Sequence, residues 1–164
     1  MNSVPKLLDS INWDFENSSS SRDIHTIHPY PAKFIPDIPR QIINLFQPAQ
    51  EHAILDPFCG SGTTLLEANK LGYDAVGIDL HPLACLISKV NTTPIAKGFD
   101  NQINPLISRA KNRLEDDDFS IPEIPRLDHW FQMNVQQAIA TLVTEINEIE
   151  DIIIRDALRV ALSS

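Results

Sequence analysis

The chain has 164 residues, a hydrophobic content of 43% and a formal net charge of -9 at pH 7. This length fits about one domain, and the apolar content can supply a core. No run of eighteen apolar residues is present, which excludes a membrane-spanning helix, and the first residues lack the features of a signal peptide. Because the two cysteines have no metal-ligand spacing, we expect a reducing compartment and a cytoplasmic protein.

The negative charge limits how the chain could act on nucleic acid. Proteins that bind duplex DNA usually carry a basic patch, and none is visible here. The C-terminal third is the most acidic part of the sequence. If the chain acts on nucleic acid, most phosphate contacts must therefore come from a missing segment or a partner chain.

The first 24 residues are predicted to be a flexible lead-in, because four consecutive serines at 18–21 are typical of a linker. Residues 25–164 are expected to form one partial domain. This part begins with the proline-rich segment His28-Pro29-Tyr30-Pro31-Ala32-Lys33-Phe34. Its prolines favour extended backbone until a helix begins near Pro39. An arm leading into a core helix is the plain interpretation.

The next segment, Asp56-Pro57-Phe58-Cys59-Gly60-Ser61-Gly62-Thr63-Thr64, carries the clearest chemical signal. A short apolar run, 53–55, precedes it and predicts a buried strand. A helix is expected over 65–71, ending at a left-handed Gly72, and a second strand over 75–78 ends on Asp79. The predicted order is strand, glycine turn, helix, strand and acid, which is one parallel crossover unit.

This order of elements favours a ligand that contains a nucleoside. Gly60 and Gly62 allow the backbone to turn sharply and bring its N–H groups close to a ligand. The helix that follows places a partial positive charge at the same point. Asp79 comes 19 residues after Gly60 and could accept hydrogen bonds from ribose hydroxyls.

Two common nucleotide motifs fit poorly. The third glycine of the dinucleotide fingerprint is replaced by Leu65, and the lysine of a P-loop is absent after Gly62. The segment instead resembles the S-adenosyl-L-methionine loop of class I methyltransferases, in the form found in amino-group DNA methyltransferases that modify adenine N6 or cytosine N4. The proline-rich segment at 28–34 is similar to the motif that closes over the methionine end of the cofactor in some of these enzymes.

The resemblance implies an α/β fold, a Rossmann-like class I methyltransferase sheet that is incomplete here, with a C-terminal helical segment. It implies that Phe58, Gly60 and Gly62 form the wall and floor under S-adenosyl-L-methionine. Asp56 would orient the methionine end through the loop backbone, and Asp79 would hold the ribose. The full set of expected cofactor-binding residues is Tyr30, Pro31, Ala32, Lys33, Phe34, Asp56, Phe58, Gly60, Gly62, Thr63 and Asp79.

The rest of the chain is predicted to be mainly helical. Pro82 suits the first position of a helix, and apolar spacing predicts another helix over 101–114. The acidic run at 115–118 indicates a solvated loop, because consecutive residues rarely converge on a metal. A helix capped by Asn134 and a second helix after a break near 150–151 complete the pattern. The aromatic pair Trp130-Phe131 is expected to pack rather than to stack on bases.

The catalytic motif of the family is absent from this sequence. The family activates the amino group with a polar residue, two adjacent prolines and an aromatic residue that stacks on the flipped base. The chain has twelve prolines, and no two are adjacent, so no catalytic residue is assigned. We therefore expect a split subunit, a truncated product or a fragment of a restriction–modification enzyme. A second subunit would supply the catalytic motif and the region that recognises the target DNA.

Two alternatives remain open at this point. Some RNA methyltransferases carry a similar Asp-Pro-Phe-Cys-Gly-Ser-Gly loop, although they lack the proline-rich segment at 28–34. The chain could also be a non-catalytic remnant or a regulatory partner that binds the cofactor or another subunit.

Overall fold

A computed structural model describes residues 8–9, 11–15, 30–31, 35–95 and 98–164. Contacts along the backbone divide the chain into two compact units. Unit 1 comprises Met1–Pro94 with Ser163–Ser164, and unit 2 comprises Ile95–Leu162. Most of the predicted lead-in, 1–24, lies outside the described residues. In the described part, no helix combines the length and apolar character needed to cross a membrane.

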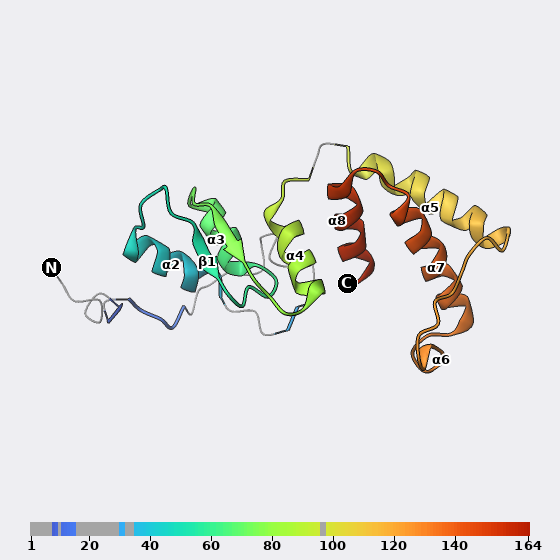
Figure 1. Cartoon of the computed structure of the whole chain (residues 1–164), viewed down its shortest axis with the longest axis horizontal. Coiled ribbons are helices and arrows are strands. Elements are labelled where there is room, and N and C mark those ends of the chain that lie inside the picture. The colour runs from blue at the N-terminus through green and yellow to red at the C-terminus, as the bar shows by residue number, and fades with distance from the viewer. Residues whose placement is uncertain (1–7, 10, 16–29, 32–34, 96–97) are drawn as a thin grey trace. The chain divides into compact units, whose positions relative to one another are not determined.

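Unit 1 contains the predicted crossover (Figure 1). Strands β1 (Ile54–Asp56) and β2 (Ala75–Gly77) are parallel and pair Ile54 with Ala75 and Asp56 with Gly77. Helix α3 (Thr63–Lys70) connects them and contacts both strands. It also packs against α2 (Asp37–Phe46) and α4 (Pro82–Thr92). This mixed unit with a small parallel sheet is compatible with the predicted α/β class.

Helix α3 contacts both strands and two helices of unit 1, and most of its side chains are therefore buried. Leu65, Leu66 and Ala68 are in the core, and so is the charged side chain of Glu67. The Glu67 carboxylate forms ion pairs with Arg40 of α2, at 2.7 Å, and with Lys70, at 3.0 Å. These pairs offset the cost of burying a charge and join α2 to α3.

The two faces of the small sheet differ in burial. Side chains alternate between faces along a strand. Leu55 and Val76 are opposite each other in the parallel register, and they are 60% and 51% exposed. Ile78 continues the same alternation and is also exposed. One face of the sheet is therefore apolar and uncovered by the described residues, while the other face meets α3.

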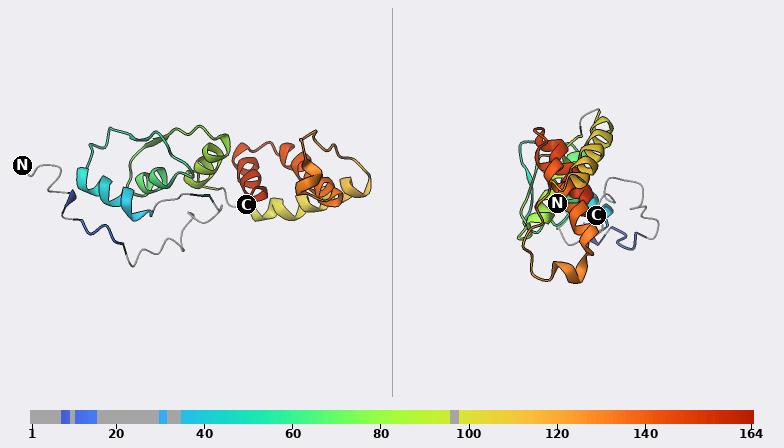
Figure 2. Two further views of the ribbon diagram at one scale, coloured as in Figure 1. Left: turned by 90° about the horizontal axis from the view of Figure 1, so that it is seen from below. Right: turned by 90° about the vertical axis from the view of Figure 1, so that its right-hand side faces the viewer.

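Unit 2 is helical, as predicted. Its elements are α5 (Asp100–Glu115), α6 (Leu127–Trp130), α7 (Met133–Asn147) and α8 (Ile152–Leu162). Helices α5 and α7 lie side by side in Figure 1 and in both views of Figure 2. Their buried side chains form one core with α8, centred on Leu106, Ile146 and Leu158.

The helix boundaries in unit 2 confirm one prediction and correct another. The break near 150–151 is confirmed, because the Asp151 carboxylate accepts hydrogen bonds from the N–H groups of Ile153 and Ile154 at the start of α8. The predicted cap at Asn134 is wrong. The cap is Gln132, two residues earlier, and helix α7 begins at Met133.

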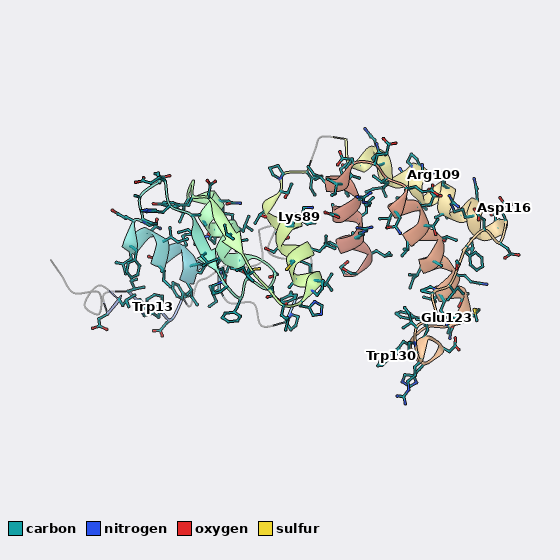
Figure 3. The ribbon with its side chains drawn as sticks, viewed as in Figure 1. Trp13, Lys89, Arg109, Asp116, Glu123 and Trp130 are labelled. Carbon is teal, nitrogen blue, oxygen red and sulfur yellow. The ribbon has the colours of Figure 1, made fainter. Side chains whose placement is uncertain are left out.

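The aromatic pair beside α6 does not pack as expected. Trp130 is 73% exposed and Phe131 43% exposed, and Trp130 projects outward from its short helix (Figure 3). The Trp130 ring contacts only its neighbour His129, edge to face at 5.0 Å between ring centres, among the ring pairs of the described residues.

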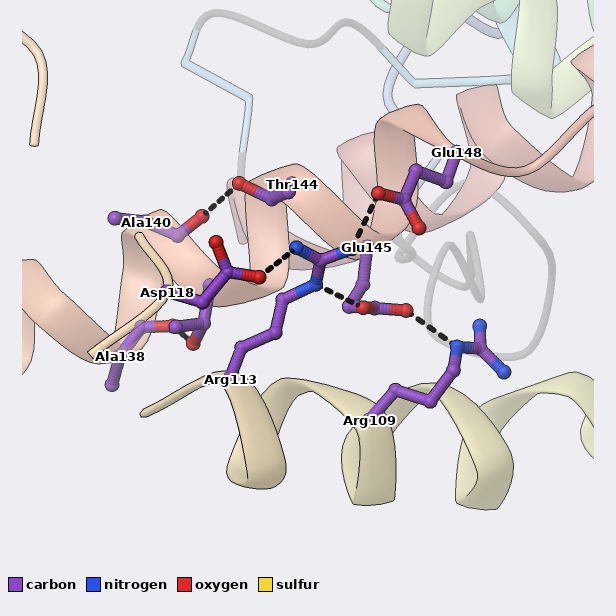
Figure 4. Close-up of polar contacts among 9 residues, drawn as sticks. Arg109, Arg113, Asp118, Ala138, Ala140, Thr144, Glu145 and Glu148 are labelled. Atoms are coloured by element: carbon purple, nitrogen blue, oxygen red, sulfur yellow. Dashed lines mark hydrogen bonds and ion pairs between the residues drawn. The ribbon is translucent and has the colours of Figure 1, made fainter. Parts of the chain in front are cut away.

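A buried carboxylate joins α5 to α7 (Figure 4). Glu145 accepts hydrogen bonds from Arg109 and Arg113, and Arg113 also reaches Asp118 and Glu148. Burial alone would raise the pKa of Glu145, but the hydrogen bonds from both arginines outweigh this effect and lower that pKa. The predicted solvated loop at 115–118 thus contributes one of its acids, Asp118, to a structural ion-pair network.

Candidate functional site

The loop between β1 and α3 is held by hydrogen bonds at several points. Asp56 accepts a hydrogen bond from the Phe58 N–H through its side chain, at 3.0 Å. The Cys59 N–H donates to the Ile78 carbonyl at 2.9 Å, and the Gly62 N–H donates to the Cys59 carbonyl at 2.8 Å. These bonds fold the loop back over the end of β2.

Gly60 and Asp79, which the sequence predicts at the same site, are in contact in the structure. Asp79 accepts a hydrogen bond from the Gly60 N–H at 2.9 Å and another from the His81 N–H at 2.8 Å. The bonds from His81 and Gly60 lower the pKa of Asp79, so its carboxylate is ionised at neutral pH. Each carboxylate oxygen can accept a second hydrogen bond, which leaves acceptor capacity for a ligand.

Gly60 and Gly62 of the loop both adopt a backbone conformation that favours glycine. The φ angles of Gly60 and Gly62 are 51° and 84°, in the left-handed region. A Cβ on Gly60 would lie 3.2 Å from the ring of Tyr30. Tyr30 therefore lies against the loop. A Cβ on Gly62 would lie 3.0 Å from the Cα of Ser88 on α4.

The start of α3 brings backbone N–H groups to the end of this loop. Gly62 is the cap of the helix and offers no side-chain hydrogen bond, and Thr63 is the first helical residue. The first N–H groups of a helix lack partners within it, and they carry the positive end of the helix dipole. The loop thus leads into the N–H groups of α3 and is hydrogen-bonded through Gly60 to the Asp79 carboxylate.

Other predicted residues differ in how the structure places them. Phe58, within the loop, is 85% exposed, and Thr63 is buried. Pro31 is exposed. Ala32, Lys33 and Phe34 lie outside the described residues. Burial raises the pKa of the Cys59 thiol, so this loop cysteine is protonated at neutral pH.

Three residues that support the loop were not identified from the sequence. A Cβ on Gly77 would lie 2.7 Å from a Leu65 methyl group and 2.9 Å from Cys59, so a glycine in β2 lets the loop approach the strand. A glycine inside a strand is a known sign of such an approach. Ser88 and Asn91 of α4 contact the loop from the other side, and the apolar spacing of α4 gave no sign of them.

Comparison with known proteins agrees with the resemblance. A family model described as DNA methylase, of the N6/N4 type, matches residues 5–90. The Type II methyltransferase M.MvaI of Kocuria varians is 32% identical over 154 residues, covering 84% of this chain and 32% of the relative. M.MjaII of Methanocaldococcus jannaschii, also a Type II methyltransferase, is 33% identical over 135 residues, covering 74% of this chain and 24% of the relative.

The match to enzymes that act on tRNA is shorter. A tRNA (guanine(10)-N2)-dimethyltransferase of Methanothermobacter thermautotrophicus is 41% identical over 51 residues, which is 31% of this chain and 15% of that enzyme. No solved structure matches the chain significantly. The chain spans about a third or less of the length of the two Type II relatives.

Proposed function

The chain belongs to the N6/N4 DNA methylase family, and from this membership we propose that it is the S-adenosylmethionine-binding portion of an amino-group DNA methyltransferase. Type II methyltransferases of this family use S-adenosylmethionine as the methyl donor. One observation carries the proposal. The carboxylate of Asp79 is hydrogen-bonded to Gly60, in the same glycine loop that leads into the N–H groups at the start of α3.

The donor set of the loop fits the two polar ends of this cofactor. The carboxylate of Asp79 keeps free lone pairs that suit the two hydroxyls of a ribose. The uncapped N–H groups at the start of α3 suit the carboxylate of a methionine moiety. The bound cofactor supplies an electrophilic methyl group. Asp56 and Gly60 act indirectly, by fixing the loop. We assign Tyr30, Pro31 and Phe58 to the wall of the cofactor site on the resemblance.

The remaining predicted cofactor residues complete the proposal. Thr63 contributes its backbone N–H at the start of α3. We assign Ala32, Lys33 and Phe34 to the methionine end on the resemblance alone. We also propose that residues 25–164 are part of a Rossmann-like methyltransferase domain, to which further strands add beside β1 and β2. The uncovered apolar face of the small sheet supports a larger domain, because parallel sheets in α/β proteins are covered by helices on both faces.

The nucleophile must be activated by residues that this sequence does not contain. An amino group conjugated with a base ring is a weak nucleophile, and a base has to leave the duplex to be modified. We propose that a further segment or a second subunit supplies the proline-proline-aromatic motif and the contacts to DNA. The relatives, which are about three times longer or more, leave room for both. A tRNA substrate is not proposed, because the match to tRNA enzymes spans only 51 residues.

Isothermal titration calorimetry with S-adenosylmethionine tests the proposal. The wild-type chain should show saturable binding, and Asp79→Ala should weaken it by about tenfold to a hundredfold through lost hydrogen bonds to a charged acceptor. Asp74→Ala removes an exposed carboxylate just before β2 and is the matched control. A chain that is folded by circular dichroism but does not bind the cofactor would refute the proposal. Methylation of DNA by this chain alone would refute the need for a further segment.

A further inference from the structure

Asn91 of α4 is a buried amide that contacts the glycine loop. Its side chain is 5% exposed, and its Nδ2 donates a hydrogen bond to the carbonyl oxygen of Ser61 at 2.9 Å. The two residues are 30 positions apart in the chain, so this bond is a tertiary contact between α4 and the loop.

A second residue on the same face of α4 contacts the next residue of the loop. Ser88 precedes Asn91 by three positions, and residues with this spacing share one face of a helix. A Cβ on Gly62 would lie 2.5 Å from the Ser88 hydroxyl and 3.0 Å from its Cα. Ser61 and Gly62 therefore rest directly on α4, one through a hydrogen bond and one through close backbone packing.

The hydrogen bond from Asn91 acts on one peptide plane of the loop. The Ser61 carbonyl and the Gly62 N–H belong to the same planar peptide group. Asn91 holds the oxygen of this group, and the Cys59 carbonyl accepts a hydrogen bond from its N–H at 2.8 Å. With both ends held, the orientation of the peptide that begins α3 is fixed.

Packing alone does not account for an amide at this position. The Oδ1 atom of Asn91 is buried and has no hydrogen-bond partner among the described residues. Burying an unsatisfied polar atom lowers stability, and an apolar side chain of similar size would avoid that cost. Turning the amide over would place its oxygen against the Ser61 carbonyl oxygen. The position requires a donor toward Ser61.

We propose that Asn91 is a positioning residue of the cofactor site, which holds the Ser61–Gly62 peptide so that the N–H groups at the start of α3 face the ligand. This inference rests on the proposed function, because it names how that same site is kept in its binding conformation. Asn91 acts through the loop and does not itself contact the cofactor.

The test replaces the amide with a group of the same shape that lacks the donor. Asn91→Asp places a carboxylate oxygen toward the Ser61 carbonyl, and calorimetry with S-adenosylhomocysteine at pH 8 should show affinity reduced by about tenfold or more. On acidification the buried carboxyl takes up a proton and can donate to Ser61 again. Affinity should therefore recover toward the wild-type value. Asn69→Asp, which introduces the same charge at an exposed position of α3, should show neither effect.

Wild-type titrations over the same pH range are the reference, because other ionisable side chains lie near the loop, namely Asp56, Cys59, Asp79, His81 and Cys85. Asn91→Leu is a second variant, which avoids a buried charge if Asn91→Asp does not fold at pH 8. It should bind the ligand more weakly at every pH, without recovery. Wild-type binding together with undiminished binding by both Asn91 variants would overturn the inference.

A ligand-free measurement separates this inference from the proposed function. If the wild-type chain binds no cofactor, the proposed function fails, but the role of Asn91 is still decided by NMR. The amide signal of Gly62 should shift in Asn91→Asp and return on acidification, whereas Asn69→Asp should leave it unchanged. A Gly62 signal that is identical in all three proteins would overturn the inference.

Discussion

Replacing Gly62 with alanine should destabilise unit 1, and Gly72 provides a matched control. The two glycines have nearly the same φ, 84° and 83°. A left-handed φ costs an alanine about 1–2 kcal/mol at either position. The added Cβ meets nothing within 4 Å at Gly72, but at Gly62 it meets the Cα of Ser88 at 3.0 Å. Rotating the serine hydroxyl away cannot relieve a contact with backbone. Overpacking of this kind typically costs about a further 1–3 kcal/mol.

The difference between the two variants therefore isolates the contact between the loop and α4. Unfolded-state effects of a glycine-to-alanine change are similar at both positions and cancel in this difference. The free energy of unfolding of unit 1 can be measured in urea from the labelling of Cys59, which is buried in the native loop. We expect Gly62→Ala to be about 1–3 kcal/mol less stable than Gly72→Ala. Equal stabilities would refute the close packing of Gly62 on Ser88.

Three further predictions concern other parts of the chain. Glu145→Gln should lower the free energy of unfolding of unit 2 by about 2 kcal/mol in urea denaturation. Glu148→Gln, at an exposed carboxylate of the same network, should cost less than about 1 kcal/mol, and equal costs would contradict the network. With a thiol reagent, the exposed Cys85 should react at once and the buried Cys59 only after the loop opens. If both cysteines reacted at once, the burial of Cys59 would be contradicted. Gly77→Ala should speed the labelling of Cys59, because its Cβ would meet that side chain at 2.9 Å, and an unchanged rate would contradict this contact.

The contribution of the Glu145 ion-pair network to the stability of unit 2 should also depend on pH. Hydrogen bonds from the arginines lower the pKa of Glu145 in the folded state, despite its burial. The stabilisation is therefore present above the pKa of the unfolded chain and is lost as the pH falls through the folded value. Thermal unfolding of Glu145→Gln should lack this acid-dependent loss. A wild-type chain whose acid-dependent loss of stability matches that of the variant would contradict the assignment.

The sequence predicted the parts of the site that depend on local geometry. A strand, two glycines and an acid at the end of the next strand were enough to bring Asp79 to the Gly60 N–H. Gly72 was correctly placed as the left-handed residue after α3, because a glycine after an apolar helical pattern has few other uses. Such features follow from residues that are close in sequence or joined by one crossover.

The parts that were missed depend on contacts between elements. Glu67 is buried because Arg40 approaches from α2, and no helical pattern in the sequence pairs those two side chains. Asn91 gave no sign of a role in the sequence, but it lies in the last turn of α4 with its amide on the Ser61 carbonyl. A lone polar residue on a helix gives no sign of which distant carbonyl it will meet.

The uncovered face of the small sheet has a thermal consequence for unit 1. Leu55, Val76 and Ile78 are already hydrated in the native state, so unfolding exposes little additional apolar surface from them. The heat-capacity change of unfolding arises mainly from newly exposed apolar surface. Unit 1 should therefore have a smaller heat-capacity change than a fully covered α/β unit of its size. Its stability curve should be flatter than that of the fully covered unit, since the curvature is set by that quantity.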